Sequence, residues 1–123
     1  MTDRKQPTVG NGDYEQMKAA ADAAIRGNSA KTAQFLVMQT VSGEISVFPN
    51  DLSAEREEYI LSELHAPLSA VLCAWAGGQL DVPSMRVRKG LMDLDPRNAE
   101  AAVFLVGERG INARRLMDCF PLV

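Results

Sequence analysis

Two unbroken apolar runs constrain the fold of this chain more than any other feature. Residues 70–76 and 101–106 are apolar throughout, and each run leads into a glycine turn followed by a helical pattern. Strands that are buried on both faces of a parallel sheet have this composition. Because parallel strands are joined by a crossover, usually a helix, the repeated pattern predicts an α/β fold.

Periodicity elsewhere completes a predicted order of α-β-β-α-β-α-β-α. Helical spacing predicts helices over 13–26, from about Ser53 to before Pro67, over 83–94, and after Gly110 with Ala113, Leu116, Met117 and Phe120 on its inner face. The runs 33–41 and 44–49, separated by Ser42-Gly43, predict a β-hairpin. We therefore expect one small α/β domain over 13–123, with a four-stranded mixed sheet (the hairpin plus two parallel central strands) covered by helices.

Length and composition limit the classes of protein that remain. With 123 residues, 46% of them hydrophobic, the chain has room for one core. Residues 1–12 are polar and aperiodic, which predicts a flexible tail rather than a signal sequence. No apolar stretch reaches the roughly 20 residues of a membrane span, so a cytoplasmic location is expected. Cys73 and Cys119 should then be reduced thiols.

The eight residues 94–101 resemble the junction segment of tetratricopeptide repeats. Such repeats recur about every 34 residues and need several copies to bury a core. No second copy occurs in this sequence, and residues 103–106 favour a strand. A repeat fold is therefore not expected.

The turns after the two apolar runs are the predicted ligand-binding positions. In open α/β sheets, ligands bind at the carboxyl ends of parallel strands, where helix N-termini offer free N–H groups to anions. The residues concerned are Gly77, Gly78, Gly107, Arg109 and Gly110. Neither turn matches a phosphate-binding glycine motif, and plain turn chemistry is the competing interpretation.

Three other residues are predicted to contact a partner. Trp75 lies near the end of the first apolar run and would either fill the core or project at the rim as an interface anchor, while Arg86 and Lys89 lie on a basic helix. A nucleic-acid partner is not expected, because the net charge is −3 and only 6% of residues are aromatic. The partner that we expect is another protein.

Catalytic and metal-binding signatures are sparse. His65 is the lone histidine, at a predicted helix end where it would cap carbonyl groups, and the two cysteines are far apart in sequence. Neither a metal nor a cofactor is predicted, and no residue is assigned to catalysis. The sequence therefore predicts a non-catalytic protein-binding or regulatory module. The alternative is a binder of a small anionic ligand, or an enzyme, that uses the turns after the third and fourth strands.

Overall fold

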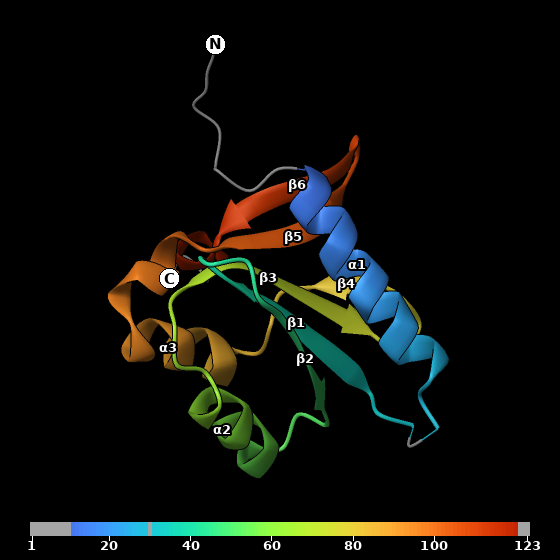
Figure 1. Cartoon of the computed structure of the whole chain (residues 1–123), viewed down its shortest axis with the longest axis horizontal. Coiled ribbons are helices and arrows are strands. Elements are labelled where there is room, and N and C mark those ends of the chain that lie inside the picture. The colour runs from blue at the N-terminus through green and yellow to red at the C-terminus, as the bar shows by residue number, and fades with distance from the viewer. Residues whose placement is uncertain (1–10, 30, 121–123) are drawn as a thin grey trace.

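A computed structural model describes residues 11–29 and 31–120 of the chain. Its backbone forms one six-stranded mixed sheet with three α-helices and two short 3₁₀ helices (Figure 1). In chain order the elements are α1 (Asn11–Arg26), β1 (Gln34–Thr40), β2 (Ile45–Asn50), α2 (Ala54–Ser62), β3 (Leu68–Trp75), β4 (Leu80–Asp81), α3 (Met85–Leu94), η1 (Pro96–Glu100), β5 (Ala102–Gly107), β6 (Gly110–Arg115) and η2 (Leu116–Cys119).

The sheet separates two apolar clusters, as alternation of side chains along the strands requires. On one face Val37, Leu72 and Phe104 pack against Met17 and Ala21 of α1. On the other face a second cluster joins the sheet to α2, α3 and η2, and it contains Leu36, Met38, Val71, Cys73 and Val103 with Ile60, Val87, Leu91 and Leu116. Helix α1 therefore covers one face, and α2 and α3 cover the other (Figure 1).

Strand β3 is the centre of the sheet. The order is β2-β1-β3-β5-β6, with β3 antiparallel to β1 and parallel to β5. The parallel pairing covers Ala70 and Val71 only, because beyond them β4 folds back and pairs with Cys73 and Ala74. A strand has only two edges and β1 occupies the other one. Strand β4 therefore lies between the carboxyl ends of β3 and β5.

Most of the predicted architecture is confirmed. The chain is a small α/β domain with a mixed sheet covered by helices, and the hairpin and the two parallel central strands are present. The strand number is six rather than four, because β4 and β6 were not predicted. Residues 94–101 form the end of α3 and η1. Most of the predicted tail, residues 1–10, lies outside the described residues, while Asn11 and Gly12 already belong to α1.

The predicted last helix is wrong. Residues 110–115 form β6, which pairs along the whole of β5, and only residues 116–119 turn helically, as η2. The apolar spacing of Ala113, Leu116 and Phe120 imitated a helix, but the backbone groups on the open edge of β5 need partners that a neighbouring strand supplies. Leu116 and Cys119 still reach the core from η2.

Within the described part of the chain, no helix is both long and apolar enough to cross a membrane.

Candidate functional site

The carboxyl end of β3 is where the sheet and the start of α2 meet. The register places Trp75 opposite Gln34 and Gln34 opposite Asn50, so these three residues form one row across β3, β1 and β2. The chain leaves β2 at Asn50 and enters α2 at Ala54. The N-terminus of α2 therefore lies at the carboxyl end of the central strand, which is the usual position of ligand sites in α/β sheets.

Short polar side chains fix the loop between β2 and α2. The Asn50 Oδ1 atom accepts a hydrogen bond from the Leu52 backbone N–H at 3.1 Å, and Ser53 caps α2 by accepting from the Arg56 N–H at 3.1 Å. Hydrogen bonds from Ser53 also lower the pKa of the Asp51 carboxyl. Leu52 is held at a φ of 69°, a conformation that costs energy for a branched side chain. Strain of this kind often accompanies a functional loop.

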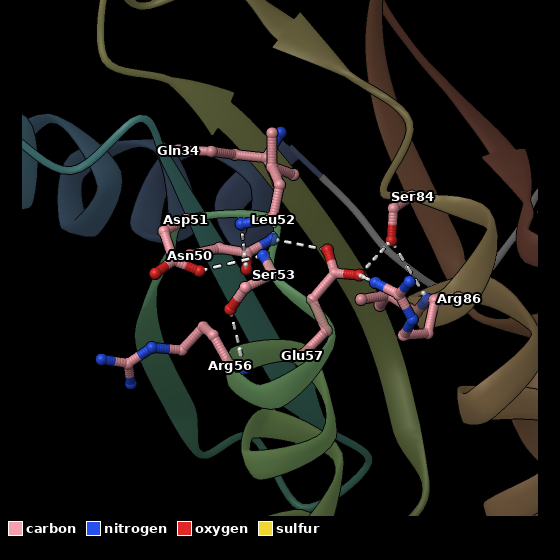
Figure 2. A network of polar contacts seen from close by, with 10 residues as sticks. Gln34, Asn50, Asp51, Leu52, Ser53, Arg56, Glu57, Ser84 and Arg86 are labelled. Carbon is pink, nitrogen blue, oxygen red and sulfur yellow. Dashed lines mark hydrogen bonds and ion pairs between the residues drawn. The ribbon is translucent and has the colours of Figure 1, made fainter.

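A buried carboxylate lies one turn inside α2. Glu57 is fully buried, and its Oε1 atom accepts hydrogen bonds from the Ser84 hydroxyl at 2.8 Å and from an Arg86 guanidinium N–H at 2.9 Å. Its Oε2 atom accepts from the Asn50 amide at 2.8 Å, and the same amide donates to the Gln34 Oε1 atom at 3.0 Å (Figure 2). We call these five residues the Glu57 network. It joins α2 to β1, β2 and the start of α3.

Two surface hollows adjoin at the start of α2. The first, of about 420 Å³, is lined by Asp51, Ser53, Glu55, Arg56 and Tyr59. The second, of about 260 Å³, is lined by Lys31, Thr32, Ala33, Pro49, Asn50, Asp51 and Arg56. Because they share Asp51 and Arg56, we treat them as one feature, the α2 trough. The Arg56 guanidinium lies 5.6 Å from the centre of the Tyr59 ring, and that ring is half exposed.

The chemistry that the trough offers is polar recognition with one aromatic face. Arg56 and Lys31 can pair with phosphate or carboxylate groups, and Asp51 and Glu55 can accept hydrogen bonds from amino or hydroxyl groups. Tyr59 provides a ring face for a planar group. Backbone N–H groups at the start of α2 add partial positive charge.

The predicted glycine turns lie at the same end of the sheet but do not lead into helices. Gly78 and Gly110 have φ values of 98° and 109° and close the β3–β4 and β5–β6 hairpins. The helix N-termini invoked for anion binding are therefore absent at Gly77 and Gly107, and that premise is wrong. Strand β4 also lies between the two turns, so they do not form one continuous rim. An anion site at Arg109 stays a prediction.

His65 lies at the opposite end of the sheet. It lines a small hollow of about 110 Å³ with Leu64, Ala66, Leu94, Asp95 and Asn98, beside the start of β3. Strand β3 has 8 residues, which at roughly 3.3 Å per residue gives a separation of about 25 Å from its carboxyl end. His65 and Arg109 therefore do not share a pocket.

Of the three residues predicted to contact a partner, Trp75 and Arg86 have hydrogen-bond partners within the fold, and the predicted partner contact of all three stays a prediction. The Trp75 indole N–H donates to the Asp81 carboxylate at 3.1 Å, and Arg86 pairs with Glu57. Lys89 lines a hollow with Met92, Asp93 and Phe120. The two cysteines are free and buried. Burial raises the pKa of the Cys73 thiol to about 12, with smaller contributions from the charges of Asp81 and Glu57.

Comparison with known proteins identifies the fold. No family model and no curated protein matches the sequence. Among solved structures, cytidine deaminase from Mycobacterium leprae superposes with a TM-score of 0.62 at 16% identity, covering 93% of this chain and 100% of that one. Cytidine deaminase from Mycobacterium tuberculosis gives a TM-score of 0.62 at 18% identity, covering 89% of this chain and 94% of that one. This chain therefore has a cytidine-deaminase-like α/β fold.

This finding corrects the functional prediction. The expectation of a non-catalytic protein-binding or regulatory module is contradicted, because the solved structures that share the fold are enzymes acting on a small molecule. The alternative of a small-ligand binder or enzyme agrees better with the fold.

The fold raises the question of zinc. Zinc-dependent nucleobase deaminases hold the metal with one His or Cys of an H-x-E segment and both cysteines of a P-C-x-x-C segment. Two segments of this chain combine that spacing with a helix start: Ser53-x-Glu55 at α2 and Pro83-Ser84-x-x-Val87 at α3. By this spacing, Ser53, Ser84 and Val87 correspond to the three ligands and Glu55 to the glutamate.

These residues do not fit zinc. Protein zinc sites use thiolate, imidazole and carboxylate ligands, whereas the three positions offer two neutral hydroxyls and a hydrocarbon. Residues 11–29 and 31–120 also contain no cluster of three His, Cys, Asp or Glu side chains suited to a metal ion. The buried Glu57 network was missed from the sequence because residues from Ser53 to before Pro67 were interpreted only as a helix, and the partners of Glu57 lie on other elements. The patterns at 53–55 and 83–87, taken together, are the signal that could have connected the two helix starts.

Proposed function

We propose that the chain binds a pyrimidine nucleoside or its monophosphate in the α2 trough, without zinc. The observation that carries the proposal is the trough itself: a polar hollow with Arg56 and an exposed tyrosine ring, at the start of α2 in a cytidine-deaminase-like fold. A nucleoside has the size and the mixed polarity that such a hollow accommodates.

Each part of the ligand has a complementary group. The planar base packs on the face of Tyr59, and its amino group donates to Glu55 or Asp51. The phosphate pairs with Arg56 and Lys31, both of which line the trough. The strained Leu52 loop is supported by Asn50, so the trough is preorganised at its centre.

A reducing compartment is part of the proposal. Cys73 and Cys119 are both free in the structure, as expected of a cytoplasmic protein.

The test is isothermal titration of the purified protein with cytidine, cytidine monophosphate and inorganic phosphate. We expect the monophosphate to bind most tightly, and an Arg56→Ala variant to lose at least about tenfold in affinity, as the loss of a charge-assisted contact predicts. Arg97→Ala is the matched control, because Arg97 is an exposed arginine paired with Asp95 beside the His65 hollow. Absence of binding by all three compounds, or equal binding by the two variants, would refute the proposal.

A further inference from the structure

The starts of α2 and α3 carry the spacing of a zinc site but none of its ligands, and they are nevertheless tied together. We infer that the Glu57 network takes the place that a metal has in zinc-dependent deaminases. It joins the two helix starts to β2 through protein groups alone. This inference concerns how the site is held and does not depend on which ligand fills the α2 trough.

The three positions with ligand spacing lie at the two helix starts that the Glu57 network joins. Ser53 accepts a hydrogen bond from the Glu57 backbone N–H at 3.0 Å through its carbonyl oxygen. The Ser84 hydroxyl donates to Glu57 at 2.8 Å and accepts from the Val87 N–H at 3.2 Å. Figure 2 shows Ser53 and Ser84 lying close to Glu57, one on α2's own start and the other on α3. Of the three side chains, that of Ser84 therefore contacts the Glu57 carboxylate directly, and this contact ties the start of α3 to α2.

The charges in this network are the reverse of those in a metal site. A zinc ion is a cation that gathers anionic or neutral donors of electron pairs. Here a buried anion gathers hydrogen-bond donors: the hydroxyl of Ser84, the guanidinium of Arg86 and the amide of Asn50. These donors come from β2 and α3, so a single carboxylate links three elements.

Arg86 also disfavours a metal ion directly. Its guanidinium, from the first turn of α3, lies 2.9 Å from the Glu57 Oε1 atom of α2. A divalent cation at this place would have to displace a positive charge that is already paired with the buried carboxylate, and breaking such a pair is costly. Metal binding and the intact network are therefore mutually exclusive.

The first experiment measures metal content and melting temperature of the wild-type protein. We expect no stoichiometric zinc after purification from zinc-supplemented medium, and the same melting temperature in buffer, in EDTA and with added Zn²⁺. One zinc per chain, or a lower melting temperature in EDTA, would overturn the inference.

The second experiment compares Glu57→Gln with Glu58→Gln, its exposed neighbour on α2. Glutamine keeps the size of the side chain but removes the negative charge to which Ser84, Arg86 and Asn50 donate, and its amide nitrogen cannot accept from them. We therefore expect Glu57→Gln to melt about 10 °C or more below the wild type. Glu58→Gln should melt within about 2 °C of it. Equal melting temperatures of the two variants would overturn the inference.

A third experiment tests whether zinc can take the place of the Glu57 network. The variant that combines Ser53→Cys, Ser84→Cys and Val87→Cys with Glu57→Gln carries three thiols and lacks the buried anion. We expect it to bind one Zn²⁺ per chain and to gain melting temperature when zinc is added, while Glu57→Gln alone gains none. If zinc neither binds nor stabilises the combined variant, the ligand positions are assigned wrongly and the inference fails.

Discussion

Two buried asparagines, one at each end of the sheet, have very different hydrogen-bond partners. Asn98, beside the start of β3, accepts from the Leu68 backbone N–H and donates to the Leu91 carbonyl, both at 2.8 Å. Asn50, at the carboxyl end, donates to the side chains of Glu57 and Gln34 and supports Leu52. The first asparagine satisfies backbone groups. The second organises other side chains around a buried charge.

This difference distinguishes a buried polar residue that stabilises the fold from one that organises a candidate site. A side chain that pairs only with backbone needs no particular neighbours, and its whole effect is on folding. A network of side chains specifies several residues at once and depends on each of them. The carboxyl end also has the strained loop and hollows of about 420 and 260 Å³, against about 110 Å³ for the hollow that Asn98 lines. Buried polar residues therefore locate the candidate site when their partners, and not only their burial, are compared.

Replacing Asn98 should give the largest effect. Asn98→Ala leaves the buried Leu68 N–H without its side-chain acceptor and removes one of two donors from the Leu91 carbonyl, which keeps the Asp95 N–H. We expect a loss of about 3–4 kcal/mol in the free energy of unfolding. Binding at the α2 trough should be unchanged in the protein that remains folded. Urea titration and ligand titration measure the two quantities. Weaker ligand binding by the Asn98→Ala variant would show that the two ends of the sheet are not independent.

Replacing Asn50 should affect both stability and binding. Asn50→Ala removes one donor to Glu57, which keeps Ser84 and Arg86, so we expect a smaller loss of about 2–3 kcal/mol. Leu52 also loses its side-chain acceptor, which frees the loop beside the trough. Affinity for cytidine monophosphate should fall by about tenfold, which corresponds to 1.4 kcal/mol. Unchanged affinity would show that the loop does not preorganise the trough.

The two serine caps at the carboxyl end of the sheet can be compared with each other. Ser53 caps α2, whereas Ser84 caps α3 and also donates to Glu57. We expect Ser53→Ala to cost about 1 kcal/mol and Ser84→Ala about 2 kcal/mol, because only the second removes a donor from a buried carboxylate. Thermal or urea unfolding distinguishes these values, and equal costs would argue against the importance of the hydroxyl in the network.

The Cys73 thiol should have the smallest effect on stability at neutral pH. Cys73 pairs with Asp81 in the β3–β4 ladder, and its pKa is raised from 9.0 to about 12. We expect Cys73 to stay unlabelled by iodoacetamide at pH 8.5 while the protein is folded, since the thiolate is the nucleophile. In the unfolded chain the same thiol ionises near pH 9, so it contributes stability below that pH and loses it progressively as pH rises toward 12. Mass spectrometry after labelling checks the first expectation and unfolding at several pH values checks the second.

Periodicity predicted the parts of the fold that local sequence controls. The apolar run 70–76 and the Ser42-Gly43 turn specify β3 and the first hairpin with little influence from the rest of the chain. The strands β4 and β6 were not predicted because their residues acquire a partner edge only after β3 and β5 are in place. Arg86 was interpreted as a surface charge for the same reason: its pairing with Glu57 spans 29 residues of sequence, and charge type alone does not reveal it.

The sheet order also has a consequence for folding kinetics. Strands β1 and β2, β3 and β4, and β5 and β6 each form a hairpin whose contacts are local in sequence. The parallel contact between β3 and β5 spans far more of the chain and pairs only two residues on each strand. Local hairpins form in microseconds, whereas a long loop must lose more entropy before its few contacts can form. The β1–β3 pairing is also long-range, since it joins Thr40 to Leu68 and Gln34 to Trp75. We expect the hairpins to form early and these two long-range pairings to be the slow steps that complete the sheet.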